Sequence, residues 1–239
     1  AIGTGLDAPR NYIFAVTERL RELTGLGLAR GENLIDATQN FDVFVEVSGI
    51  LKALAASLCK TATDLRLLAS GPAAGFGEIR LPAVQSGSSI MPGKVNPVIC
   101  EAVTQAAIAT MANDVAITQA AAMGNLELNA FGPLVAEKLL ESISLLTNAC
   151  EIFTTRCIIG IEADEARCRQ LAESSTAILT ALVQHIGYQA ASDLATQAAE
   201  TGASIRTLAT DSGLLDETTF DQLTSPEAVT ALGFRKPKE

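Results

Sequence analysis

Residues 42–69 have the sequence DVFVEVSGILKALAASLCKTATDLRLLA, and this stretch indicates the fold more directly than any other part of the chain. Its apolar side chains recur every three or four residues, which is the spacing of one face of an α-helix. The pattern continues until Ser70-Gly71-Pro72, a combination that ends helices. We therefore predict one helix over residues 42–69, about 40 Å long. Its apolar face comprises Phe44, Val47, Leu51, Leu54, Leu58, Leu65 and Leu68.

The same spacing recurs on both sides of this helix. It predicts helices from Pro9 to Gly25, over residues 96–123 and over residues 133–157. Strand signals are scarce, because Ala-rich stretches replace alternating β-branched and aromatic residues. The sequence thus predicts an all-α fold: a long-helix bundle over residues 1–160, followed by a small helical C-terminal domain over residues 161–239, where the helical segments become shorter.

Composition excludes several classes of protein. With 239 residues and 48% hydrophobic content, the chain is long enough to bury a sizeable core. It carries 17 Lys and Arg against 27 Asp and Glu, a net charge of -10, and no basic cluster, so we expect no nucleic-acid partner. It has no apolar run of about 18 residues, so we expect no membrane segment.

The five cysteines are odd in number and form no CxxC pair, which favours a reducing, cytoplasmic location. His185 is the one histidine, and its place just before Gly187 favours a helix C-terminus over a catalytic or zinc role. We expect no metal site and no cofactor. The chain begins without an initiator Met or a signal peptide, which suggests a truncated or processed chain.

Residues 71–95 interrupt the helices with many glycines and prolines, and loops longer than about 15 residues are usually functional or disordered. Their last part, GSSIMPGKVNP over residues 87–97, carries two hydroxyls, an ammonium and an amide to the start of a helix. A helix N-terminus favours an anion there, and Gly87 and Gly93 would allow the loop to open and close. An ordinary polar loop that ends in a capping Asn96 is the alternative.

This loop resembles the signature of the fumarase/aspartase superfamily, and all of its fixed positions are present. The resemblance extends along essentially the whole chain and matches the C-terminal half of such enzymes. Supporting segments are GTGL over residues 3–6, DLRLL over 64–68, SGP over 70–72, ND over 113–114, GNLELN over 124–129 and HIGY over 185–188.

The resemblance implies a β-elimination in which a base removes a proton next to a carboxylate, an aci-carboxylate forms, and ammonia or water leaves to give fumarate. It implies that residues 86–96 form the catalytic loop, that Ser88 is the catalytic base and that Lys94 and Asn96 bind a substrate carboxylate. Glu101 corresponds to a glutamate that pairs with an activating histidine, although a first-turn carboxylate is also favoured by the helix dipole. The supporting residues are Glu101, Ser89, Gly87 and Gly93.

The superfamily builds each site from three subunits of a homotetramer. The activating histidine, and the Ser and Thr residues that bind the other carboxylate of the substrate, belong to the N-terminal half of the family's enzymes. The resemblance therefore implies that this chain supplies one wall of a dicarboxylate site and is inactive in isolation. Two residues depart from the family pattern: Asp7 stands in place of Asn, and Ala73 in place of Arg. Asp7 places a carboxylate where the family has an amide, and Ala73 removes a cation.

Within the superfamily, APR over residues 8–10, ENLIDAT over 32–38 and LTNAC over 146–150 resemble aspartases more than fumarases. We therefore expect an aspartate ammonia-lyase type of carbon-nitrogen lyase. Two alternatives remain open: a fumarate hydratase, and an inactive structural or complementation fragment.

Overall fold

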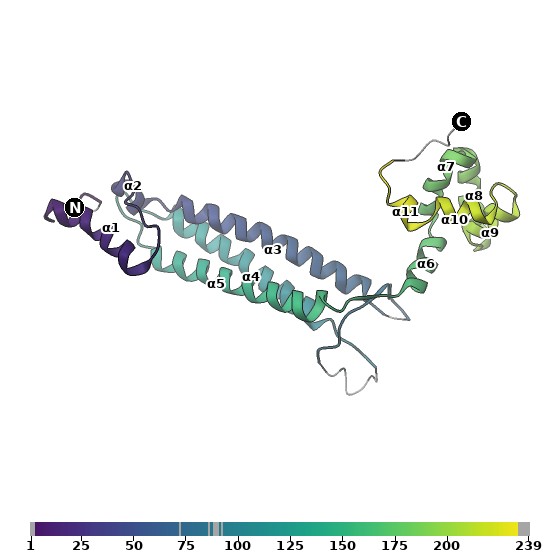
Figure 1. Ribbon diagram of the computed structural model, residues 1–239, viewed down its shortest axis with the longest axis horizontal. Helices are drawn as coiled ribbons and strands as arrows, with labels where there is room; N and C mark the ends of the chain where they lie inside the picture. The colour runs from purple at the N-terminus through teal and green to yellow at the C-terminus, as the bar shows by residue number, and fades with distance from the viewer. Residues whose placement is uncertain (1–2, 72, 86, 88–90, 92, 234–239) are drawn as a thin grey trace. The chain divides into compact units, whose positions relative to one another are not determined.

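The computed structural model describes residues 3–71, 73–85, 87, 91 and 93–233 (Figure 1). The chain divides into two compact units. The first comprises Ala1–Phe76 and Leu81–Glu162, and the second comprises Gly77–Arg80 and Ala163–Glu239. Helices dominate both units, and the strands of the described residues are only two residues long. The all-α prediction is confirmed.

Three long helices of the first unit lie side by side: α3 (Asp42–Leu68), α4 (Val98–Ala122) and α5 (Gly132–Phe153) (Figure 1). The helix α4 runs antiparallel to α3, because Ser48 near the start of α3 contacts Asp114 far along α4. At the other end, Arg66 in the last turn of α3 lies beside Glu101 in the first turn of α4. The three helices occupy the ranges that the apolar spacing predicts, apart from the end of α5.

Small residues fill much of the space between these helices. Ala55 and Ala62 of α3, Ala107 of α4 and Ala149 of α5 are almost completely buried. Alanine allows helix axes to approach closely, so the alanines that argue against strands also explain the packing. Larger side chains surround them, and each contributes roughly 1.5–3 kcal/mol by its burial. These are Val103, Ile117, Val135, Leu146 and Phe153.

A layer of polar side chains crosses this core. Asp114 of α4 is 5% exposed and accepts hydrogen bonds from Ser48 (2.8 Å) and Lys52 (2.6 Å) of α3. The preceding residue, Asn113, donates a hydrogen bond to Ser142 of α5 (3.2 Å). Two adjacent residues of α4 therefore bind its two neighbours, and these bonds form in only one register of the three helices.

Two shorter helices precede the bundle in sequence. The helix α1 (Arg10–Thr24) starts after Pro9 and ends at Gly25, whose φ of 66° is left-handed, as the sequence predicts. No residue of α1 is buried in the described structure. The helix α2 (Leu34–Gln39) has no apolar repeat that would predict it, and Asn33 caps it by accepting from two backbone N–H groups.

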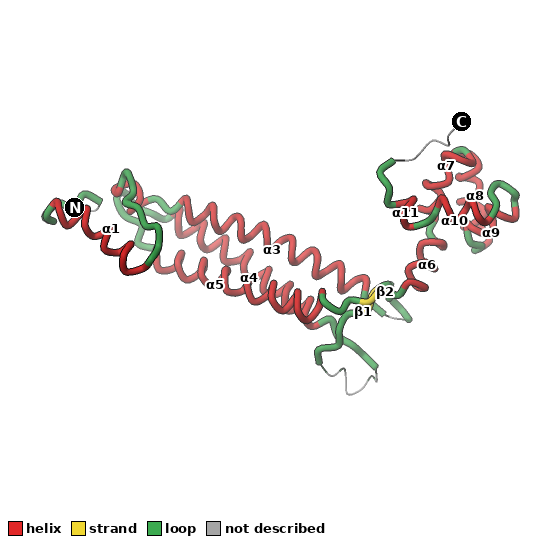
Figure 2. The backbone as a smooth tube through the Cα atoms, in the orientation of Figure 1, coloured by secondary structure: helices red, strands yellow, loops and turns green. Residues whose placement is uncertain are grey.

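The second unit contains short elements, and Figure 2 shows its small strands in yellow. The strands β1 (Ile79–Arg80) and β2 (Glu162–Ala163) pair, so a piece of the loop before α4 groups with this unit, which no sequence pattern indicates. Its helices are α6 (Glu165–Ser174), a 3-10 turn (Thr176–Ile178), α7 (Leu179–Ile186), α8 (Tyr188–Thr201), α9 (Ile205–Asp211), α10 (Glu217–Leu223) and α11 (Pro226–Val229). They enclose a separate core that includes Leu182, Leu194, Ile205 and Phe220.

The helix α5 ends differently from the sequence prediction. The α-helix predicted over residues 133–157 becomes a π-helix at Thr154–Ile158, where the Ile159 N–H donates to the Thr154 carbonyl (3.0 Å). The wider turn adds one residue while Phe153 and Cys157 both stay buried.

His185 lies in the last turn of α7, where a cation suits the helix dipole. Within the described residues, no helix combines the length and the apolar character that a membrane span needs.

Candidate functional site

The loop that carries the family signature leads into the N-terminus of α4. Ser88 and Ser89 lie outside the described residues, whereas Gly87, Met91 and residues 93–97 are described. Gly87 packs directly against the backbone of Lys94, where a Cβ would overlap the Lys94 carbonyl oxygen. The two ends of the loop therefore meet, and glycine is required because the backbones approach so closely.

Lys94 is exposed at the end of this loop. Its N–H donates to the Met91 carbonyl (3.3 Å), and the preceding Gly93 has a left-handed φ of 79°. This turn is accessible to glycine without strain and brings the Lys94 backbone beside Gly87. The Lys94 ammonium forms no ion pair within the described residues, so its charge is available to an anion.

Asn96 does not cap α4, which corrects the prediction of an Asn cap. The helix begins at Val98, and the Val98 N–H bonds to the Asn96 backbone carbonyl (2.9 Å) around Pro97. Pro97, at φ -80° and ψ 52°, forms a tight turn, because proline restrains its own φ and keeps the preceding residue out of helical conformation. The half-buried Asn96 side chain makes no hydrogen bond to any other described residue, so its amide is available to a ligand.

The start of α4 is anchored by the core beneath it. Cys100 and Val103 are fully buried and pack with Phe153 and Cys157. The sulfur atoms of Cys100 and Cys157 lie 3.6 Å apart. Burial and the contact with Cys157 raise the pKa of the Cys100 thiol to about 12, so it stays protonated at neutral pH. These thiols therefore serve packing rather than nucleophilic chemistry.

Glu101 follows in the first turn of α4. Its carboxylate lies 3.9 Å from the guanidinium of Arg66, at the end of α3. Both side chains are about two-fifths exposed (41% and 42%), so the pair contributes little to stability in water. Within this unit, the charge of Arg66 is partly balanced by Glu101.

Arg156 of the π-helix also reaches this end of the bundle. It lines a small hollow together with Asn96 and Pro97, over an apolar floor formed by Leu81 and Cys100. The hollow has a volume of about 10 Å³, which is enough for a water molecule and too small for a dicarboxylate. The described residues around Asn96 therefore form no pocket that could enclose a dicarboxylate.

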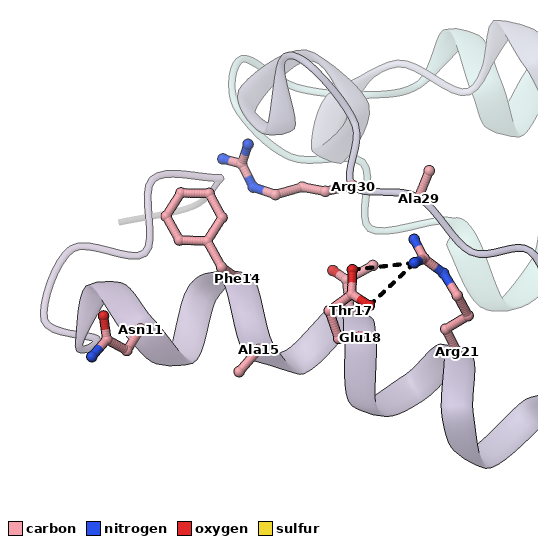
Figure 3. Close-up of a pocket in the computed structure, with 8 residues that line it drawn as sticks. All are labelled: Asn11, Phe14, Ala15, Thr17, Glu18, Arg21, Ala29 and Arg30. Atoms are coloured by element: carbon pink, nitrogen blue, oxygen red, sulfur yellow. Dashed lines mark hydrogen bonds and ion pairs between the residues drawn. The ribbon is translucent and has the colours of Figure 1, made fainter.

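A second hollow lies between α1 and the segment that follows it (Figure 3). The guanidinium of Arg30 stands 5.7 Å from the centre of the Phe14 ring. Arg21 is already bonded to Glu18 (3.2 Å) and to the Leu28 carbonyl (2.7 Å). The residues that line this second hollow all belong to α1 and the segment after it, so the hollow is not part of the candidate site.

Comparisons with known proteins identify the family. A family profile described as "Lyase" matches residues 1–112, and one described as "Fumarase C C-terminus" matches residues 178–231. An aspartate ammonia-lyase of Bacillus subtilis is 46% identical over 233 residues, which are 98% of this chain and 49% of the relative. The chain belongs to the fumarase/aspartase superfamily. This confirms the resemblance seen in the sequence.

Other members of the superfamily are similar to a comparable degree. An aspartate ammonia-lyase of Pseudomonas fluorescens is 47% identical over 97% of this chain and 48% of its own length. A class II fumarate hydratase of Pseudomonas aeruginosa is 44% identical over 98% of this chain and 50% of its length. The structure of a fumarate lyase:delta crystallin of Brucella melitensis matches with a TM-score of 0.90 and 44% identity, over 97% of this chain and 50% of that one. The chain thus spans about half the length of the relatives it matches.

Several motif residues of this superfamily member have structural roles. Asn129 is buried, donates to the carbonyls of Ala120 (3.0 Å) and Ala121 (3.2 Å), and accepts from the Phe131 N–H, which joins the end of α4 to α5. Asp7, which departs from the family's Asn, has a left-handed φ of 85°. Both Asn and Asp tolerate that conformation, so the departure leaves the backbone unstrained.

Sequence reasoning missed Arg66 and Arg156, although both lie at this end of the bundle. Arg66 falls within a motif that the superfamily shares, so the motif itself was a signal. Arg156 had no such signal, because helical periodicity does not predict the π-helix that carries it. Three cations, Lys94, Arg66 and Arg156, thus gather near the N-terminus of α4 in a protein with a net charge of -10.

The contact between Gly87 and Lys94 gives a first prediction. Gly87→Ala should push the two ends of the loop apart and lower kcat/KM of the assembled enzyme about tenfold, because misplaced catalytic groups react slowly. Gly49→Ala in α3 is the matched control, since a Cβ there meets nothing within 4 Å. Steady-state kinetics would compare both variants; equal activity of the Gly87 variant and the wild type would show that the close contact does not position the loop.

Proposed function

We propose that this chain supplies the catalytic loop of an aspartate ammonia-lyase. The reaction is β-elimination of ammonia from L-aspartate to give fumarate. The observation that carries the proposal is the complete signature over residues 87–96, which leads into α4. The aspartate ammonia-lyases among the relatives, at 46–47% identity, support this choice of substrate.

In the proposed mechanism, Ser88 removes a proton from the carbon next to one carboxylate. The electron pair moves into that carboxylate and forms an aci-carboxylate dianion, which then collapses to the double bond as the C–N bond breaks and ammonia leaves. A serine hydroxyl is a weak base in water, so backbone N–H groups and exclusion of solvent must stabilise its alkoxide.

Lys94 and Asn96 are the proposed carboxylate-binding groups. An exposed ammonium and an amide without another partner in the described residues fit that task. Both precede the N-terminus of α4, whose unpaired N–H groups and dipole favour the additional negative charge of the dianion. Glu101 is the proposed supporting carboxylate; it lies in the first turn of α4, 3.9 Å from the guanidinium of Arg66.

The proposed enzyme is a homotetramer whose sites combine several chains. Large apolar side chains on all three long helices are exposed in the single chain, including Ile50 (66%), Val115 (61%) and Leu140 (66%). Exposed apolar faces on long helices favour association with further helices. The five free cysteines support a reducing, cytoplasmic location. Sedimentation of the protein would test the tetramer.

The proposed active species, called the assembled lyase below, is this chain combined with the half of its relatives that it does not span. The second candidate substrate is L-malate, because a fumarate hydratase matches at 44% identity. The test is to follow the ultraviolet absorbance of fumarate with L-aspartate and L-malate in parallel. We expect kcat/KM for aspartate to exceed that for malate at least about tenfold. A preference for malate would move the assignment to fumarate hydratase.

A further inference from the structure

Arg156 occupies an unusual position in the backbone. It lies in the middle of the π-helix Thr154–Ile158, and helical segments of this kind occur frequently at functional sites. The adjacent Cys157 is buried against Cys100, whereas Arg156 itself is exposed. The core contact therefore fixes the backbone of this turn and leaves the guanidinium outside.

Arg156 and Asn96 line the same small hollow. It forms no hydrogen bond and no ion pair with any other part of the chain that the structure describes. The two other cations near the start of α4 differ from Arg156. Arg66 lies beside Glu101, and Lys94 is carried by the catalytic loop itself. Arg156 is thus a cation that a rigid element presents next to Asn96 without a counter-ion from the described residues.

A cation in the last turn of a helix is also favoured by the helix dipole, so the position alone does not assign a role. A dipole role is best served when the side chain bonds the last carbonyls, and Arg156 makes no such bond to a described residue. The N–H groups of its guanidinium instead match the geometry of a carboxylate. Arg156 also lines the same hollow as Asn96, whose side-chain amide makes no hydrogen bond to another described residue.

We propose that Arg156 is a substrate-binding residue, whose guanidinium binds the carboxylate of the dicarboxylate that lies against Asn96. This inference rests on the proposed function for the identity of the substrate. Because this carboxylate gains negative charge as the aci-carboxylate forms, the guanidinium contributes to substrate binding and, more strongly, to stabilisation of the intermediate.

The kinetic test uses the assembled lyase with three variants. Arg156→Met should lower kcat/KM for L-aspartate at least about tenfold, with a higher KM and a lower kcat, because a charge-assisted hydrogen bond is lost both to the bound substrate and to the aci-carboxylate. Arg156→Lys should fall between Met and the wild type, because it keeps the charge and loses the guanidinium. Arg19→Met, on the surface of α1, is the matched control and should leave KM unchanged. An unchanged kcat/KM in Arg156→Met would overturn the inference and leave the proposed function standing.

A binding measurement separates this inference from the proposed function. Succinate, an unreactive dicarboxylate, is titrated into the isolated chain while the Nε–Hε resonance of Arg156 is followed by NMR. A saturable shift in the wild type, with Asn96→Ala weakening the apparent affinity, supports the inference even if the wild-type assembly forms no fumarate. The absence of a saturable shift of that resonance in the isolated wild-type chain would overturn it.

Discussion

Replacing Ser88 by alanine in the assembled lyase is expected to lower kcat for fumarate formation about a thousandfold, which is the order of effect that proton transfer by a positioned side chain provides. KM for L-aspartate should change little, because a base acts on the transition state more than on the bound substrate. The measurement is steady-state kinetics on the purified assembly, with fumarate absorbance as the readout.

The control for Ser88→Ala is Ser86→Ala, which removes a hydroxyl from the same loop at a position outside the signature. It should keep most of the wild-type rate. If Ser88→Ala retained kcat within a few-fold of the wild type, the assignment of the base would be wrong, while the choice of substrate would stand.

The second large effect concerns stability. Asp114→Ala should lower the free energy of unfolding of the first unit by about 2–3 kcal/mol, because the buried Ser48 hydroxyl and the Lys52 ammonium lose their acceptor. Asp64→Ala is the matched control: it also breaks an Asp–Lys pair, but both side chains are largely exposed, so its effect should be close to zero. Chemical denaturation would compare the two variants. Equal losses would show that burial of the pair has no energetic consequence.

The same aspartate predicts a pH dependence. Burial raises the pKa of Asp114, but the hydrogen bonds from Lys52 and Ser48 outweigh it and hold the pKa below its ordinary value. A carboxylate with a lowered pKa in the folded state stabilises the protein fully above its unfolded pKa of about 3.9, and this stabilisation is lost as the pH falls through the folded value. The difference in stability between wild type and Asp114→Asn should therefore shrink below about pH 4. A difference that stays constant in that range would contradict the account.

The long helices were predictable because their signal is local. Apolar side chains at every third or fourth position of residues 42–69 require a helix whatever the rest of the chain does, and α3 follows that range. The contact of Asp114 with Ser48 and Lys52 was not predictable in this way. Ser48 and Lys52 lie 66 and 62 positions before Asp114, so only the antiparallel packing of α3 and α4 brings them together.

The position of the candidate site in the sequence was predictable, but the arrangement of its residues in space was not. The resemblance of residues 87–97 to the superfamily signature located the loop. The same residues predicted that Asn96 caps α4, which is wrong. The helix α4 begins only at Val98, after Pro97. Arg156 lines the same hollow as Asn96 and lies in a π-helix, which interrupts the periodicity on which sequence reasoning depends.

The most direct test of the central claim is complementation. This chain is mixed with the half of the Bacillus subtilis aspartate ammonia-lyase that it does not span, and fumarate and ammonia are measured after addition of L-aspartate. We expect the two products in equal amounts from the mixture, none from either half alone, and almost none when this chain carries Ser88→Ala. A purified complex of both halves that forms no fumarate from L-aspartate would contradict the claim that this chain supplies the catalytic loop of an aspartate ammonia-lyase.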